Sequence, residues 1–234
     1  VFKKISSDFW GPRMEHILRN AILTLLEQPE SVLSDLPLLL TDKYFRLNMV
    51  EKISNRNVRD FWLSEFEKYS AWTRSEATAP ILNRIGQFLS TTLIHNIIGQ
   101  PKSAFDLRDI MDSGKIIIAD LSKGKIGDDN CSLLGSLLVT KLQLAAMSRA
   151  DSPEEDRKPF HLFVDELHSF LTLSFADILS ESRKYGLYLV MSHQYVDQLD
   201  ERIKAAIIGN VGTIIAFRLG AEDAKNLSRE FYPV

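Results

Sequence analysis

Residues 115–234 alternate short apolar runs with helical stretches, and this alternation constrains the fold more than any other feature of the sequence. The apolar runs are KIIIADL (115–121), FHLFV (160–164), LYLVMSH (187–193) and GTIIAF (212–217). A strand that is apolar at nearly every position is typical of a sheet covered on both faces. Strands that alternate with helices along the chain form a parallel sheet. The sequence therefore predicts an α/β domain over residues 113–234, with helices on both faces of a parallel sheet.

Residues 1–112 have a helical pattern instead. Pro12 stands where a helix can begin, and apolar residues such as Ile17 and Leu18 follow at the spacing of one helix face. The same spacing returns in residues 55–70 and 79–98. No run in this half has a strand pattern. We therefore predict a separate all-α domain over residues 1–112.

The composition is that of a globular protein with a buried core, since 45% of the 234 residues are hydrophobic and 25% are charged. A net charge of −3 argues against a uniformly basic nucleic-acid coat but allows a local basic patch. Cys131 is the single cysteine, which excludes an internal disulfide and fits a reducing compartment. No apolar run reaches the roughly 18 residues of a membrane span. The start at Val1 has neither an initiator methionine nor a signal peptide, so we expect an internal piece of a longer chain.

Two acids, Asp165 and Glu166, follow the apolar run 160–164 directly. In an open parallel sheet, functional residues collect at the carboxyl ends of the strands. An apolar strand followed by Asp-Glu is the Walker B pattern, in which the Asp holds Mg²⁺ through water and the Glu polarises the attacking water. The alternative is a strand that ends in a solvated acidic turn. The two acids alone do not decide between these interpretations.

Polar residues around the next apolar run favour the first interpretation. Gln194 follows the run 187–193, where a residue that senses the γ-phosphate of a nucleotide would stand. Arg183 and Lys184 precede the same run, at the end of a predicted helix. Basic residues suit a helix C-terminus, while an arginine there could also reach a neighbouring subunit's nucleotide. Spacing alone favours the helix-terminus role for Arg183.

Two weaker features remain. The loop 122–127 carries Lys123 and Lys125, which predicts either a solvated turn or a loop that neutralises DNA phosphates. The histidines have no spacing typical of metal ligands, so we expect no zinc site; they include His161, His168 and His193.

Together, several segments resemble the TraG/TraD-type coupling ATPases of type IV secretion and conjugation, members of the HerA/FtsK group of RecA-like motors. The segments are WGPRMEHILRN, APILNRIGQFLS, IIIADLSKGKIGDDN, FHLFVDELHSF, ESRKYGL, SHQY and GNVGTIIAFRLGAEDA. The resemblance covers nearly the whole chain and is more specific in the second half. It implies a RecA-like P-loop NTPase sheet with an all-α domain inserted into the nucleotide-binding domain, which matches the helical first half.

The resemblance also implies a function. Members of this family are hexameric rings that use ATP and Mg²⁺ to pump single- or double-stranded DNA at the cytoplasmic face of the inner membrane. Their partners are secretion-channel and relaxosome proteins. Carried over to this chain, Asp165 and Glu166 match the Walker B pair, and Gln194 matches the sensor. Arg183 matches the finger between subunits, and Arg218 is a candidate for a phosphate or interface contact.

One departure from the family pattern is large, because the sequence contains no Walker A loop, GxxxxGK[ST]. The Gly-Lys pairs at 114–115 and 124–125 are each followed by isoleucine and do not fit it. We expect the Walker A loop and the membrane anchor upstream of Val1, and the isolated chain to be inactive as an ATPase. Two alternatives stay open: a secretion-assembly ATPase or HerA-like DNA-repair translocase, and a non-catalytic domain that docks substrates.

Overall fold

The structure is a computed structural model, and its contacts divide the chain into two compact units. It describes residues 2–5, 10–171, 175–196, 199–228 and 230–231. The helical unit comprises residues 6–104, and the sheet unit comprises residues 1–5 and 105–234.

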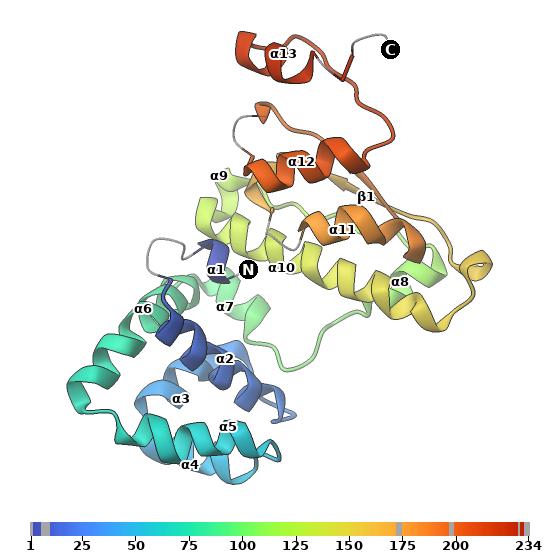
Figure 1. The fold of residues 1–234 in the computed structure, drawn as a ribbon. Coiled ribbons are helices and arrows are strands. Elements are labelled where there is room, and N and C mark those ends of the chain that lie inside the picture. The colour runs from blue at the N-terminus through green and yellow to red at the C-terminus, as the bar shows by residue number, and fades with distance from the viewer. Residues whose placement is uncertain (1, 6–9, 172–174, 197–198, 229, 232–234) are drawn as a thin grey trace. The chain divides into compact units, whose positions relative to one another are not determined.

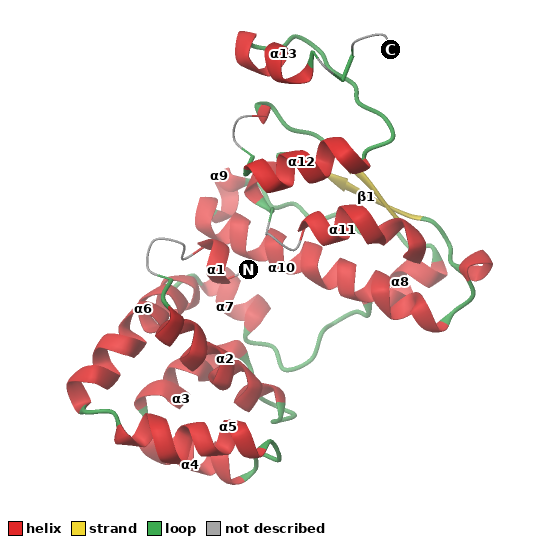
Figure 2. Ribbon diagram, viewed as in Figure 1, coloured by secondary structure: helices red, strands yellow, loops and turns green. Residues whose placement is uncertain are grey.

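The helical unit contains only helices and turns among its described residues (Figure 2). Its helices are α2 (Pro12–Leu26), α3 (Leu36–Thr41), α4 (Lys43–Glu51), α5 (Arg56–Asp60), α6 (Ala71–Leu89) and α7 (Thr92–Ile98), with a π-helical turn at Phe61–Glu65 and 3-10 turns at Leu33–Asp35 and Phe66–Lys68. Pro12 occupies the first position of α2, as its fixed φ favours. Asp42 caps α4 by accepting a hydrogen bond from the Phe45 backbone N–H.

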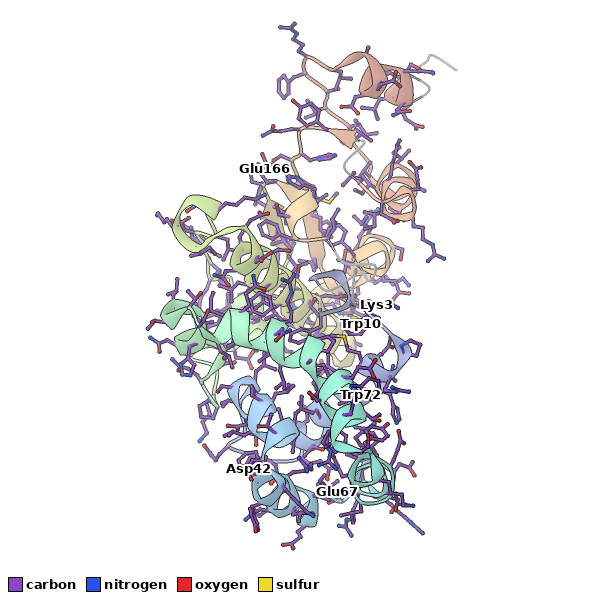
Figure 3. The ribbon with its side chains drawn as sticks, turned by 90° about the vertical axis from the view of Figure 1, so that its left-hand side faces the viewer. Lys3, Trp10, Asp42, Glu67, Trp72 and Glu166 are labelled. Atoms are coloured by element: carbon purple, nitrogen blue, oxygen red, sulfur yellow. The ribbon has the colours of Figure 1, made fainter. Side chains whose placement is uncertain are left out.

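A buried arginine joins three parts of the helical unit. Arg46 is 1% exposed, and its guanidinium donates to the carbonyl of Leu39 at 3.1 Å and to the carboxylate of Glu67 at 2.6 Å. The guanidinium also lies 5.0 Å from the centre of the Phe66 ring. Burial acts to raise the pKa of Glu67, but the hydrogen bond and charge of Arg46 outweigh it and lower that pKa. In Figure 3, Glu67 is labelled among the helices of this unit.

The sheet unit contains two parallel strands. They are β1 (Phe160–Val164) and β2 (Leu187–Met191), paired so that Phe160 lies opposite Leu187 and Val164 opposite Met191. The helices of this unit are α1 (Phe2–Ile5), α8 (Leu107–Ser113), α9 (Lys123–Ile126), α10 (Asp128–Met147), α11 (Phe175–Glu181), α12 (Glu201–Asn210) and α13 (Ala221–Leu227). Helix α8 packs on α10 (Figure 1), so it falls in this unit although its sequence pattern continues that of the first half.

The core of the sheet unit lies on one side of the two strands. Helices α8, α10, α11 and α12 and the inward-facing strand residues contribute buried side chains, among them Met111, Leu142, Val164, Ile178, Leu187 and Ile203. On the opposite face, Phe163 is 72% exposed and Val190 is 47% exposed. The cover of helices on both faces of a larger sheet stays a prediction.

Two of the four predicted strands do not form. Residues 115–121 and 212–217 are described, and neither takes part in the sheet. Ile118 is 91% exposed and Phe217 is 89% exposed. An apolar run becomes a strand only when a neighbouring strand forms hydrogen bonds with its backbone N–H and C=O groups. The pattern of apolar residues in one run does not show whether such a neighbouring strand exists. The RecA-like parallel sheet stays a prediction.

Helix α10 has a further property. The stretch Asp128–Asp151 is long and apolar enough, by length and composition, to cross a membrane. The core helix of a soluble protein passes the same test, and α10 supplies Val139 and Ala146 to the core. This property is weak support for a membrane span.

Candidate functional site

The candidate site lies where the carboxyl ends of β1 and β2 meet. Two backbone hydrogen bonds join the segments just past the strands: Ser192 N–H donates to Val164 O at 2.9 Å, and Leu167 N–H donates to Ser192 O at 3.1 Å. Ser192 Oγ also donates to Oδ1 of Asp165. Because parallel strands in register end together, residues that directly follow them are brought into contact.

This arrangement brings Glu166 and Gln194 together. Gln194 Nε2 donates to Oε1 of Glu166 at 2.5 Å, although 28 positions separate the two residues. Figure 3 labels Glu166 at the end of β1. The structure thus gathers Asp165, Glu166 and Gln194, the three residues that the sequence analysis selected around the ends of these strands.

The backbone of Glu166 has a left-handed conformation, with φ of 51°, and it is the one described residue other than glycine with positive φ. Its carbonyl accepts a hydrogen bond from Ser169 N–H at 3.0 Å, within the 3-10 turn Leu167–Ser169. Such a conformation costs roughly 1–3 kcal/mol for a residue with a Cβ, and strain of this kind is frequent at functional sites. No sequence pattern indicated it.

One histidine lies beside the carboxylate of Glu166 and a second lies near the first, and sequence reasoning, which tested histidines only as metal ligands, missed them. Nδ1 of His168 lies 3.4 Å from Oε2 of Glu166. The ring of His193 lies 6.5 Å from the ring of His168, measured between centroids. Burial lowers the pKa of His193 most, and the neighbouring His168 lowers it further. The charges of Asp223 and Glu166 act to raise this pKa but do not outweigh the first two causes. The usable signal was the position of His168, two residues after an acid at a strand end.

Arg183 lies at the other end of the strands. It is exposed in the 3-10 turn Ser182–Tyr185, which leads into the start of β2. Arg149, which is 1% exposed, donates to the carbonyls of Lys158 at 3.0 Å and Tyr185 at 3.1 Å. These bonds fasten the turn to the segment before β1. The structure does not bring Arg183 to the Glu166 of the same chain.

The two lysines of the predicted DNA loop lie in α9, a short helical turn, and each is paired with an acid. Lys123 Nζ lies 2.9 Å from Asp128, and Lys125 pairs with Asp120. Hydrogen bonds from Lys125 and Ser122 lower the pKa of Asp120 to about 2. A hydrogen bond with Asp128 raises the pKa of Lys123, and the charge of Glu166 adds to this rise. Each positive charge of the loop 122–127 is therefore balanced by an acid that lies just outside the loop.

A cavity of about 790 Å³ borders the candidate site. Its lining includes the apolar residues Leu138 and Leu142 of α10 and the charged residues Asp165, Glu166 and Lys123. The unpaired segment 114–123 forms another wall. Arg218 has no part in this site, because it is exposed in the segment between α12 and α13 and does not line the cavity.

The carboxylates fit a hydrated Mg²⁺ ion better than a directly bound metal. Among the described residues, no group of three or more His, Cys, Asp or Glu side chains could hold a metal ion. Asp165 accepts from Ser192 Oγ and from the Glu166 N–H on the same oxygen, Oδ1. This leaves Oδ2 to accept from water of a hydrated ion. For a triphosphate the chain lacks a phosphate loop, as its sequence contains no GxxxxGK[ST] pattern.

Comparison with known proteins gives one finding for this part of the chain. Residues 159–231 match the family described as the TraM recognition site of TraD and TraG. The match includes both strands and all three residues gathered at their ends, and it supports a conjugation protein of the TraG/TraD type. No curated protein and no solved structure matches the chain.

Proposed function

We propose that the chain is part of an ATP-driven, DNA-translocating motor, a coupling protein of type IV secretion or conjugation. The match of residues 159–231 supports the conjugative role. The main support for a motor function is the hydrogen bond from Gln194 to Glu166, at the carboxyl ends of adjacent parallel strands. A sensor and a catalytic carboxylate must lie within reach of the same phosphate, and this contact meets that requirement.

Each residue of the proposed site has a distinct task. Asp165 would hold Mg²⁺ through water, and the ion would neutralise phosphate charge. Glu166 would orient and polarise the attacking water, and Gln194 would exchange its contact with Glu166 for a γ-phosphate oxygen. The triphosphate itself requires a phosphate loop that these residues do not contain.

The wider assembly is part of the same proposal. Arg183 would act on the nucleotide of a neighbouring subunit in a homo-hexamer at the cytoplasmic face of the inner membrane. DNA, secretion-channel proteins and relaxosome proteins would be its partners. Lys123, Lys125 and Arg218 are weaker candidates for DNA or interface contacts, the two lysines because acids already pair with them.

A second candidate is a non-catalytic docking domain for a relaxosome protein. It is favoured by the description of the matched family, which names a recognition site for TraM. A docking domain would bind such a partner without nucleotide, and Glu166 would be dispensable for its role.

DNA transfer between cells tests the proposal. A strain that lacks the gene would be complemented with wild-type protein, with Glu166→Gln, or with the control Glu181→Gln, which removes an exposed acid at the end of α11. The motor predicts that Glu166→Gln abolishes transfer at normal protein levels while Glu181→Gln supports it. Normal transfer with Glu166→Gln would refute the motor and leave the docking domain.

A further inference from the structure

The turn that carries Arg183 is held by a second arginine besides Arg149. Arg157 lies in the segment between α10 and β1 and is half-buried. Its Nη1 donates to the carbonyl of Lys184, and its guanidinium carbon lies 5.7 Å from the centre of the Tyr185 ring. The proposed function uses Arg183 and gives Arg157 no task.

The other nitrogens of Arg157 fix its guanidinium from the opposite side. Nε donates to the carbonyl of Ser152 at 3.0 Å, and Nη2 donates to the same carbonyl at 2.6 Å. Ser152 N–H in turn donates to the carbonyl of Arg149 at 3.0 Å. Because the guanidinium nitrogens lie in one rigid plane, a guanidinium bound on both sides holds two backbone segments at a fixed distance.

Four successive backbone carbonyls of the turn each accept a hydrogen bond. The acceptors are the carbonyls of Arg183, Lys184, Tyr185 and Gly186, and their donors are Gly186 N–H, Arg157, Arg149 and Phe160 N–H in that order. The backbone beneath Arg183 is therefore fixed, while the residue itself is exposed. An exposed cation on a fixed backbone is suited to act on a group outside its own unit.

Two of these donors are side chains, and they differ in what else they do. Arg149 is 1% exposed and its Nε lies 2.8 Å from Asp112, so its removal would disturb the interior. Arg157 is more open to solvent and makes its side-chain hydrogen bonds to Ser152 and Lys184. Arg157 is therefore the donor whose removal affects the turn most selectively.

We propose that Arg157 is a positioning residue for Arg183, holding the turn Ser182–Tyr185 so that the guanidinium of Arg183 meets the nucleotide of a neighbouring subunit. This inference rests on the proposed function. A finger stabilises transition-state charge only from the correct place. Without Arg157 the turn would sample further positions, and kcat would fall while the binding of Mg-ATP would not.

Turnover of the full-length protein separates positioning from a merely structural role. We expect Arg157→Gln to lower kcat for Mg-ATP by on the order of tenfold to a hundredfold with little change in KM. In an Arg183→Ala background the same change should lower kcat no further, because a residue that acts through Arg183 has no effect once Arg183 is gone. Lys158→Gln, which changes the adjacent exposed cation, is the matched control and should behave as wild type. An equal loss of kcat in both backgrounds would overturn the proposal.

A second readout does not depend on turnover. In the 234-residue chain, the amide hydrogen of Gly186, which is bonded to the carbonyl of Arg183, should exchange with solvent faster by on the order of tenfold in Arg157→Gln and at the wild-type rate in Lys158→Gln. Absence of turnover in the wild-type protein would refute the proposed function, and this role with it. Unchanged exchange in Arg157→Gln, with normal turnover of the wild type, would overturn the role of Arg157 alone. Where Arg157→Gln fails to fold, Arg157→Lys replaces it in both measurements, with smaller effects in the same direction because lysine lacks the planar fork.

Discussion

Glu166 combines an unfavourable backbone conformation with a side chain at the centre of the candidate site. Its φ of 51° suits glycine, yet the position carries a glutamate that contacts Gln194 and His168. This combination is expected when a residue is retained for chemistry at the expense of stability.

The strain at Glu166 gives a prediction for stability. Glu166→Gly and Glu166→Gln both remove the charge, but only glycine relieves the left-handed backbone. We expect the glycine variant to be more stable than the glutamine variant by about 1 kcal/mol in urea unfolding followed by circular dichroism. A glutamine variant that is equally stable would show that this conformation stores no strain.

At the same scale, the sequence predicted part of the site. The grouping of Asp165, Glu166 and Gln194 followed from their positions after apolar runs, because parallel strands end at a common edge. The contact of His168 could not be predicted, since it depends on the positive φ of Glu166 and on the tight turn that follows. Neither feature has a pattern in the sequence.

Among the elements, helix α10 supports the segment after β1 with small residues. A Cβ at Gly135 would lie 2.1 Å from Cδ1 of Phe170, so the close approach of this segment requires glycine there. Gly86, within α6, has no atom within 4 Å of such a Cβ and offers a matched control.

We therefore expect opposite effects from two glycine-to-alanine changes. Gly135→Ala should lower the free energy of unfolding by about 1–3 kcal/mol, because the ring of Phe170 must move. Gly86→Ala should raise it by about 0.5–1 kcal/mol, because alanine favours the helix. Urea unfolding followed by circular dichroism measures both, and a neutral Gly135→Ala would mean that α10 does not support the segment as described.

Arg46 of α4 pairs with Glu67 in the turn before α6, and this pairing predicts that the stability of the helical unit depends on pH. The pKa of Glu67 in the folded state lies below 4.5, so its contribution to stability is complete above that pH and is lost as pH falls through the lowered pKa. Tryptophan fluorescence reports this unit alone, because Trp10, Trp62 and Trp72 all lie in it. Stability should therefore fall as the pH drops below about 4.5 and through the lowered pKa of Glu67.

Glu67→Gln tests this pH dependence against Glu76→Gln, which changes an exposed acid on α6. The first variant should be less stable at pH 7 and show a flatter loss of stability on acidification. The second should follow the wild type. Equal curves for all three proteins would exclude Glu67 as the source of the acid sensitivity.

Element prediction succeeded where local signals were sufficient. Pro12 marks the start of α2, and two of the apolar runs form β1 and β2. The runs at 115–121 and 212–217 failed as strands because strand formation depends on a neighbour, which local residues do not determine.

At the scale of the whole molecule, the proposed ring gives Arg183 a task in a neighbouring subunit. It lies in the turn before β2, at the strand end opposite to Glu166. Arg183→Ala in the full-length protein should lower turnover by on the order of 10³-fold or more, with nucleotide affinity nearly unchanged. Lys184→Ala, which changes the adjacent exposed cation, is the control. Turnover that survives in Arg183→Ala would return this residue to the helix-terminus role.

The most direct test of the motor is the rate of Mg-ATP hydrolysis by the full-length protein in the presence of DNA, compared between wild type and Glu166→Gln at saturating nucleotide. If Glu166 polarises the attacking water, kcat should fall by about 10²-fold or more while nucleotide binding persists. Equal rates in the two proteins, or no hydrolysis by a wild-type protein that binds Mg-ATP and DNA, would contradict the proposed site.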